Sequence, residues 1–279
     1  MKKYLWISLA VWGLIVAAYL LVYLKTQKSV DPNEKPFVIV TTFHNTKDYF
    51  KKNLDSIVSQ KYSNFIVIYV NDASTDDTPL SVSKYIHEKG LEDKVFQVHN
   101  KIRMGALANL DKTVRHLKSN EIVVVVDPDD WLAHDNVLAY LNQVYEDPNV
   151  WLTYGQFSIS PTDAPGFASQ IPQDVIEQNT FRSSGGATHL KTFYAGLYQH
   201  ISHDDLLFQG QYYPLAWDNA ILMPMLEMSG IHSRFIPDVL YVYNKMSALK
   251  EENLNRELQI VFDQRIRAKK KYKPIDSYE

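Results

Sequence analysis

Short apolar segments alternate with longer amphipathic ones along residues 36–131 of this 279-residue chain. Four apolar segments have the length and β-branched content of buried strands. The segments between them carry apolar residues at helical spacing, as in Leu107, Leu110, Val114 and Leu117. This alternation predicts an α/β fold, with a mostly parallel, Rossmann-like sheet flanked by helices. The predicted strands are 36–43, 64–72, 94–100 and 121–127, and the predicted helices are 46–60, 75–90 and 104–118.

The pattern becomes less regular after residue 150. Residues 154–173 are rich in Gly, Pro and Ser, which predicts a long loop or lid. A helix is predicted over 188–201, and a second one over 216–230 contains Pro224 and several methionines that suit a core face or a cleft. A strand over 233–244 and a charged amphipathic helix over 250–273 complete the expected elements.

The N-terminal segment 4–24 is an uncharged apolar run, long enough to cross a hydrocarbon core of about 30 Å. A cleaved signal peptide is the alternative, but its apolar region is shorter, roughly 7–15 residues, and ends in a small-x-small site that is absent here. We therefore expect one N-terminal transmembrane helix, a single-pass membrane anchor, followed by a polar linker over 25–36. Lysines lie on both sides of the span, which leaves its orientation open.

Charge and cysteine content exclude several classes of protein. The chain has 29 Lys and Arg against 32 Asp and Glu, a net charge of −3, so no basic excess indicates nucleic-acid binding. It has no cysteine, which excludes a disulfide framework and a thiolate metal site.

Polar clusters follow three of the predicted strands. They are "TTFHN" at 41–45, "VNDAST" at 70–75 and "VDPDDW" at 126–131. Because the carboxyl ends of parallel strands meet at one edge of a sheet, and ligands bind at that edge, we expect these clusters to form a site.

The acidic cluster comprises Asp127, Asp129 and Asp130 and is interrupted by Pro128, which ends the strand. Oxygen-rich clusters suit hard divalent cations such as Mg²⁺ or Mn²⁺, which complete their coordination with water and substrate phosphates. The alternative is an acidic loop that caps the following helix.

Asp72 and Arg103 are further candidates at this edge. Asp72 ends a strand, where an acid commonly accepts hydrogen bonds from a ribose or base, although an ordinary turn explains it equally well. Arg103 precedes Gly105 at a helix start, a position that attracts phosphate, but a solvated arginine is the simpler explanation for it alone.

Five short motifs in sequence order carry a resemblance to a known family. They are "TTFHN", "SIVSQ", "VNDASTDDT", "NKIRMGALANL" and "VVVVDPDDW". With these motifs the chain resembles the inverting family 2 glycosyltransferases of the GT-A fold. The corresponding motifs of that family are "PTYN", "SIxxQ", "DDGSTDxT", "NxGxxxARN" and "DxDD". The later segments "HLKTFYAGL" and "AWDNAILMPMLEMSG" also resemble a subset of these enzymes.

The resemblance implies roles for the residues at the strand ends. Thr42 and His44 fall at the start of the nucleotide pocket, where an aromatic ring commonly stacks on the base, so either the imidazole or Phe43 is expected to stack. Asp72 is expected to contact the uracil or ribose, and Arg103 the base or diphosphate. The resemblance also implies that the donor is a nucleoside-diphosphate sugar, with a UDP-sugar favoured.

The same resemblance assigns the acids. Asp127 and Asp129 are expected to bind the nucleotide, and Asp129 and Asp130 the Mn²⁺ or Mg²⁺ on the diphosphate, with the direct ligand left open. The family's catalytic base is the second acid of an "ED" pair, and here that pair is Trp217–Asp218. Asp218 is therefore the expected general base of a single displacement with inversion, although a helix cap also explains it.

These assignments divide the chain into an anchor (4–24), a linker (25–36), a donor half (37–150), an acceptor and catalytic half (151–249) and a charged C-terminal helix and tail (250–279). Two other functions stay open. A catalytically silent nucleotide-sugar-binding protein is compatible with the lost first acid at position 217. A nucleotidyltransferase also uses a metal and a nucleotide, but "TTFHNTKDYF" lacks the glycines of its phosphate loop. The acceptor, whether glycan, lipid or protein, is not indicated.

Overall fold

The computed structural model describes residues 31, 33–185, 187–249 and 251–279, with side chains omitted for 251–254. The segment 4–24, predicted as a membrane anchor, and most of the predicted linker lie outside this part. Within the described part, no helix is both long enough and apolar enough to cross a bilayer.

The first half of the chain forms the expected parallel strands. They lie in the order β3-β2-β1-β4, and the neighbouring pairs are all parallel. Successive helical crossovers place β2 beside β1 and β3 beside β2, and the chain then returns across the sheet to place β4 on the other side of β1. The bounds are β1 (Phe37–Phe43), β2 (Phe65–Asn71), β3 (Val95–His99) and β4 (Ile122–Val125).

The second half extends the same sheet. β8 (Lys191–Tyr194) runs antiparallel between β4 and β6 (Leu152–Ser160), and β11 (Ser233–Asn244) runs parallel to β6. The short β5 (Trp131–Leu132) pairs with β11, and β7 (Ala164–Pro165) with β6. The sheet is therefore mostly parallel, as predicted, and β1, β2, β4, β6 and β11 all end at one edge. A separate small sheet pairs β9 (Leu207–Phe208) with β10 (Gln211–Tyr212).

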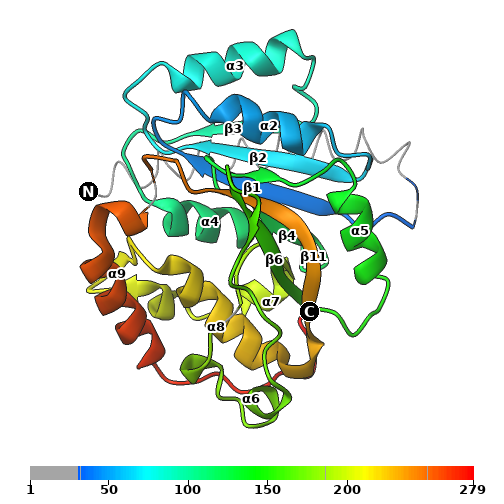
Figure 1. Cartoon of the computed structure of the whole chain (residues 1–279), viewed down its shortest axis with the longest axis vertical. Helices are drawn as coiled ribbons and strands as arrows, with labels where there is room; N and C mark the ends of the chain where they lie inside the picture. The colour runs from blue at the N-terminus through cyan, green and yellow to red at the C-terminus, as the bar shows by residue number, and fades with distance from the viewer. Residues whose placement is uncertain (1–30, 32, 186, 250) are drawn as a thin grey trace.

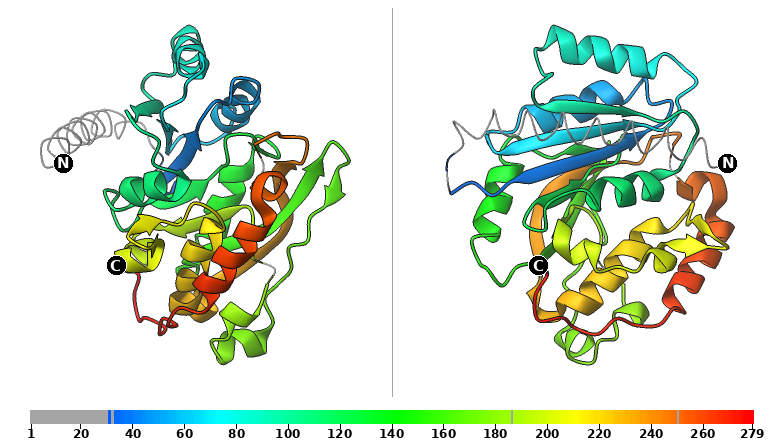
Figure 2. Two further views of the ribbon diagram at one scale, coloured as in Figure 1. Left: turned by 90° about the vertical axis from the view of Figure 1, so that its left-hand side faces the viewer. Right: turned by 180° about the vertical axis from the view of Figure 1, so that it is seen from behind.

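Helices cover the sheet, as Figures 1 and 2 show. The helices α2 and α3 lie on one face of β1 to β3, and α4 lies on the opposite face beside α7 and α8. Apolar side chains from both layers and the sheet form a continuous core. The helices are α2 (Phe50–Val58), α3 (Thr78–Glu88), α4 (Ala106–Val114), α5 (Val137–Val144), α6 (Gln173–Glu177), α7 (Ala195–Gln199), α8 (Trp217–Ser229) and α9 (Glu251–Arg267).

Two predictions after residue 150 are wrong. The segment 188–201 is not one helix, since its first part forms β8, whose four residues are all buried between two strands and therefore show no helical face. The segment 154–173 is not entirely a loop, since it begins inside β6. Gly155 lies in this strand opposite Ile236 of β11, and a Cβ at this position would lie only 3.0 Å from the main-chain oxygen of Ile236, so the pairing leaves little room for a side chain.

The methionines of α8 belong to the core and do not line a cleft. Met223, Met225 and Met228 are all buried, as is the neighbouring Leu226. The helix is apolar on nearly every side after its first turn, as expected for a helix that is packed between other elements. Its first turn, which contains Asp218, is the part that reaches the candidate site.

Candidate active site

A side-chain contact connects the carboxyl ends of β1 and β2, where the nucleotide pocket is predicted. Thr42 and His44 are both partly exposed there, and Nδ1 of His44 lies 2.9 Å from the main-chain oxygen of Asp72. Phe43 is buried and packs on Tyr69, with ring centroids 4.8 Å apart. A stacking role for Phe43 is therefore wrong, and of the two rings considered only His44 has an exposed surface.

Asp72 binds the loop before α4 with both carboxylate oxygens. Oδ1 accepts hydrogen bonds from Asn100 Nδ2 and the Met104 amide, at 2.9 and 2.8 Å, and Oδ2 accepts one from the Gly105 amide at 2.8 Å. Asn109 Oδ1 in turn accepts a hydrogen bond from Asn100 Nδ2 at 2.7 Å. Burial by itself raises the pKa of the Asp72 carboxyl, but the hydrogen bonds outweigh it and hold that pKa below its ordinary value.

Arg103 is exposed on the loop that Asp72 holds. It lies two residues before Gly105, whose φ of +88° places it in a region that L side chains rarely adopt. Asp72 therefore fixes the backbone of the two residues that follow Arg103. Direct contact of either residue with a nucleotide stays a prediction.

The acidic turn after β4 is fixed by an asparagine of α2. Nδ2 of Asn53 donates to the main-chain oxygens of Asp127 and Asp130, at 2.9 and 2.8 Å. Its Oδ1 accepts a hydrogen bond from the buried hydroxyl of Tyr69 at 3.1 Å. The side chain of Asn53 is buried, so the position of the turn relative to the sheet is well defined.

Asp130 faces β11, within the fold. Its Oδ2 accepts a hydrogen bond from the Tyr241 hydroxyl at 2.9 Å, and its Oδ1 accepts one from the Asn244 amide at 2.8 Å. Burial and the nearby carboxylates of Asp127 and Asp130 hold the pKa of Tyr241 well above its usual value, so the phenol stays protonated and donates. The role of Asp130 as a metal ligand stays a prediction, and its observed contacts are those of a structural residue.

Asp127 is partly exposed at the strand end, and Asp129 is buried two residues later. Within the described residues, no three His, Asp or Glu side chains converge to form a metal site by themselves. One or two carboxylates fit a Mg²⁺ or Mn²⁺ ion whose other ligands are water and phosphate oxygens. The residues present therefore fit a cation held jointly with a diphosphate.

Asp218 lies in the first turn of α8, directly after Ala216 in the left-handed conformation (φ 55°) and the buried Trp217. Its side chain is 40% exposed, and its Oδ1 lies 2.5 Å from Nζ of Lys191. The predicted base is thus an accessible carboxylate paired with a cation. Its role as a base stays a prediction.

A series of contacts connects Asp218 to the acidic turn. Nζ of Lys191 lies 3.3 Å from Nδ1 of His189, whose ring stacks on Tyr241 at a centroid distance of 4.6 Å. The Tyr241 hydroxyl accepts a hydrogen bond from the amide of Asp127 at 3.1 Å. These contacts connect the predicted base to the predicted nucleotide-binding acids through the sheet.

Sequence reasoning did not identify Asn53, His189, Lys191 and Tyr241. It found the "SIVSQ" motif without a function for it. The structure shows that Ser56 Oγ accepts the Leu132 amide hydrogen at 3.1 Å. Gln60 donates to the oxygen of His134 and accepts from the Leu138 amide, so it anchors the start of α5. These contacts fix the segment that follows the acidic turn.

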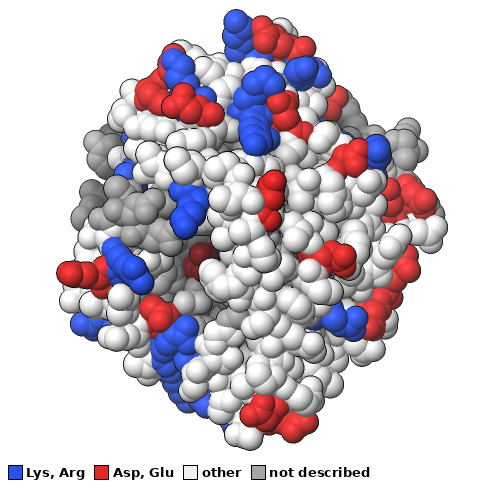
Figure 3. Space-filling view, in the orientation of Figure 1, with Lys and Arg blue, Asp and Glu red and all other residues white. Residues whose placement is uncertain are grey.

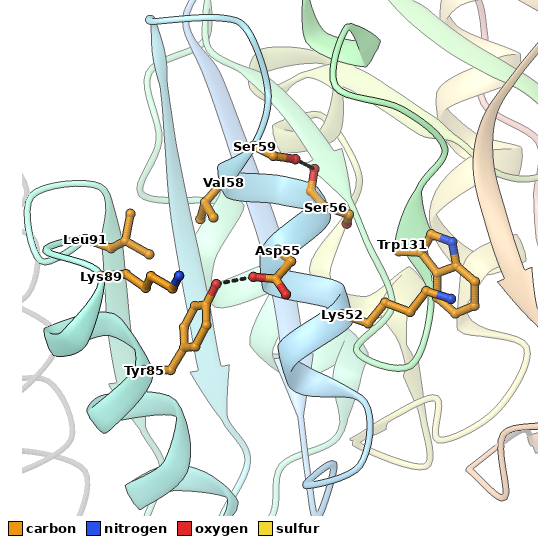
Figure 4. Close-up of a pocket in the computed structure, with 9 residues that line it drawn as sticks. All are labelled: Lys52, Asp55, Ser56, Val58, Ser59, Tyr85, Lys89, Leu91 and Trp131. Carbon is orange, nitrogen blue, oxygen red and sulfur yellow. Dashed lines mark hydrogen bonds between the residues drawn. The ribbon is translucent and has the colours of Figure 1, made fainter.

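The surface is hollowed near α4 in the view of Figure 3, with acidic and basic side chains close together around the hollow. A second depression of about 600 Å³ lies over the outer side of α2 (Figure 4). Trp131, which ends the acidic motif, lines this second depression, where Nζ of Lys52 lies 3.3 Å from its ring centroid. The tryptophan is thus part of an outer surface and packs against Lys52 of α2.

Two solved structures illustrate what the fold is similar to. TarS of S. aureus (residues 1–349), in complex with UDP-GlcNAc, matches with a TM-score of 0.57 and 16% identity, over 84% of this chain and 70% of that one. The mannosyltransferase PcManGT from Pyrobaculum calidifontis, in complex with GDP-Man and Mn²⁺, matches with a TM-score of 0.58 and 21% identity, over 95% and 75%. The fold is therefore GT-A-like, an α/β architecture with a curled, mostly parallel sheet.

Sequence comparison agrees with the fold. A curated relative, the glycosyltransferase GlyA of Streptococcus pneumoniae serotype 4, is 28% identical over 108 residues. These residues are 39% of this chain and only 15% of that protein's length. The family model described as "Glycosyl transferase family 2" matches residues 38–206, more than half of the chain. The chain therefore belongs to glycosyl transferase family 2.

Proposed function

We propose that this protein is an inverting glycosyltransferase that moves a sugar from a nucleoside-diphosphate sugar to an acceptor hydroxyl. The observation that carries the proposal is the accessible carboxylate of Asp218. A series of contacts connects this residue to the acidic turn after β4. An exposed acid close to a nucleotide-binding sheet edge is the arrangement that a general base requires.

In this proposal Asp218 removes the proton of the acceptor hydroxyl while that oxygen attacks the anomeric carbon. The new bond joins this carbon to the acceptor oxygen, and the bond to the diphosphate oxygen breaks on the opposite face, which inverts the configuration. Asp218 alone is assigned to the reaction, which suits a single displacement, because a double displacement needs a further nucleophilic group that forms a covalent intermediate. The proton ends on Asp218, and the electron pair of the broken bond leaves with the nucleoside diphosphate.

The donor is proposed to bind within residues 37–150 and the acceptor within 151–249. Arg103, His44 and Thr42 would face the nucleotide, and Asp72 would act mainly by holding the Arg103 loop. Asp127 would bind the nucleotide and Asp129 the Mn²⁺ or Mg²⁺, with Asp130 as the second candidate ligand. A divalent cation there would offset the negative charge on the departing diphosphate. A UDP-sugar is the favoured donor, and the TarS complex with UDP-GlcNAc supports a donor of this class.

Calorimetry with UDP-GlcNAc, GDP-mannose and further UDP-sugars, with and without Mn²⁺, tests the proposal on the full-length protein. We expect one donor to bind in a metal-dependent manner and to release its nucleoside diphosphate. Asp218→Asn should keep the donor affinity and lose turnover by about 100-fold or more. Full turnover in Asp218→Asn would show that the base is another residue.

A silent nucleotide-sugar-binding protein is the second candidate. It is favoured by Trp217, which replaces the first acid of the "ED" pair and is buried against the core. Such a protein would bind a donor but release no nucleoside diphosphate with any acceptor. A nucleotidyltransferase would instead release pyrophosphate from a nucleoside triphosphate, so the released product distinguishes all three functions.

The apolar run 4–24 further supports a single-pass N-terminal membrane anchor. If this is correct, the full-length protein remains in the membrane fraction after alkaline carbonate washing, and a variant lacking residues 1–30 does not. Recovery of both forms in the same fraction would contradict the anchor.

A further inference from the structure

Lys191 is a buried cation in the centre of the sheet. It lies on β8 opposite Val125, the last residue of β4 and two positions before Asp127. Its side chain is 1% exposed. Removing an ammonium group from water costs several kcal/mol, roughly, unless a counter-charge and hydrogen bonds offset the cost. The contacts of Lys191 therefore indicate why a charge is kept at this position.

The ion pair of Lys191 with Asp218 is strongly asymmetric. The ammonium is 1% exposed, whereas the carboxylate is 40% exposed, and their contact uses a single oxygen, Oδ1, at 2.5 Å. One end of the pair is thus held inside the fold, and the other end is accessible from the site.

A second buried ion pair in the protein has a different geometry. Arg182 and Glu227 are 5% and 0% exposed, and two guanidinium nitrogens contact the two carboxylate oxygens at 2.6 and 2.9 Å. Arg182 also donates to the oxygen of Ile266, and Glu227 accepts from the Tyr272 amide. Both partners of that pair are buried, and both carboxylate oxygens are contacted. In the pair of Lys191 with Asp218, by contrast, the carboxylate is partly exposed and only Oδ1 contacts the ammonium.

The surroundings of Lys191 restrict where its ammonium can lie. His189 Nδ1 is 3.3 Å from Nζ on one side, and His189 is itself stacked on Tyr241. The ring of Trp217 lies 5.4 Å from Nζ on another side. The cation is therefore fixed between the helix start that carries Asp218 and the strand that supports the acidic turn.

We propose that Lys191 is a positioning residue for the transfer reaction. It holds Asp218 by Oδ1, so that the second oxygen points toward the acceptor hydroxyl. The flexible carboxylate loses rotational freedom before the acceptor binds, which is the entropic contribution that positioning makes to catalysis. This role rests on the proposed function, because it acts through Asp218 as the base.

The variant Lys191→Met tests the role, because methionine fills a buried site of similar length without charge, and Asp218 is exposed enough to be solvated alone. The readouts are nucleoside diphosphate release from UDP-GlcNAc, GDP-mannose and the other UDP-sugars, and donor affinity by calorimetry, on full-length protein. We expect kcat to fall about 10- to 100-fold. Donor Kd should stay within about twofold of wild type, because the proposed donor-binding residues at the strand ends are unchanged. Lys191→Arg should retain more of kcat than Lys191→Met because it keeps the charge.

The matched control is Arg115→Met, which breaks an ion pair with Asp111 outside the site and should leave kcat unchanged. Lys191→Gln is made in parallel, so that the test does not depend on the folding of one variant. It should likewise lower kcat and leave the donor Kd nearly unchanged. A lowered Tm with wild-type kcat in both neutral variants would overturn the role and make Lys191 a stabilising residue only. Donor Kd weakened as much as kcat would also overturn it, since Lys191 would then bind the donor.

A double variant separates failure of this role from failure of the proposed function. In an Asp218→Asn background, Lys191→Met should lower the residual rate by less than about twofold, because its effect passes through Asp218. A further loss as large as in wild type would overturn the role. Wild-type turnover in Asp218→Asn, or no nucleotide release by the wild type from any donor, would instead overturn the proposed function.

Discussion

Asn53 fixes the position of Asp127, because its side-chain amide donates to the main-chain oxygen of that residue at 2.9 Å. The same amide donates to the oxygen of Asp130 at 2.8 Å, so one buried side chain closes the acidic turn. A strand that ends in three aspartates brings like charges together. The structure accommodates them by turning Asp130 toward β11, by burying Asp129 and by leaving Asp127 partly exposed at the strand end.

Replacing Asn53 with alanine should destabilise both the protein and the turn. The variant loses three hydrogen bonds, two to carbonyl oxygens and one from the buried Tyr69 hydroxyl, at roughly 1 kcal/mol each, so we expect the free energy of unfolding to fall by about 3 kcal/mol. Donor affinity should also weaken, because Asp127 is no longer held. Urea denaturation and calorimetry measure the two effects. Asn149→Ala is the control, since that side chain bonds only within an exposed turn, and equal losses in both variants would contradict the role of Asn53.

The fixation of the Arg103 loop by Asp72 predicts a pH-dependent stability. The folded-state pKa of Asp72 is lowered, so its contribution is fully present above the unfolded pKa of about 3.9 and is lost as the pH falls through the folded value. Asp72→Asn should therefore lower the free energy of unfolding by about 2 kcal/mol at pH 7, and the difference from wild type should shrink below about pH 4. Denaturation curves at pH 7 and pH 3 check this, and a difference that stays constant with pH would exclude the charge as its cause.

Arg103 is predicted to act on ligand binding and hardly on stability. It is exposed at the sheet edge, so Arg103→Ala should leave Tm nearly unchanged. The affinity for UDP should fall about tenfold, the loss expected for one charge-assisted hydrogen bond to phosphate. The comparison is Lys101→Ala on the same loop, which is also exposed. Equal losses in the two variants would indicate a general charge effect without a specific contact.

The first half of the fold could be predicted from sequence because its strands and helices are regular, and four of the five motifs overlap or directly follow a strand end. β8 could not, since its four residues are buried on all sides and show neither a period of two nor a helical face. The candidate base and the strand-end acids were found from local motifs. Lys191 was missed because its partner lies 27 residues away, and Tyr241 was missed because it reaches Asp130 from 111 residues further along the chain. No spacing rule reveals such pairs.

Replacing Asp130 should mainly lower the stability of the protein, whereas replacing the neighbouring Asp129 should mainly weaken Mn²⁺-dependent UDP binding. Asp130→Ala removes the acceptor for the Tyr241 hydroxyl and the Asn244 amide, so it should cost about 2–4 kcal/mol of stability. Asp129→Ala should keep more of the stability and lose the Mn²⁺-dependent part of UDP binding. Thermal unfolding and calorimetry with UDP, with and without Mn²⁺, measure both. If Asp130→Asn folds normally and loses the Mn²⁺ dependence while Asp129→Ala keeps it, Asp130 is the ligand and its contacts with β11 rearrange on binding.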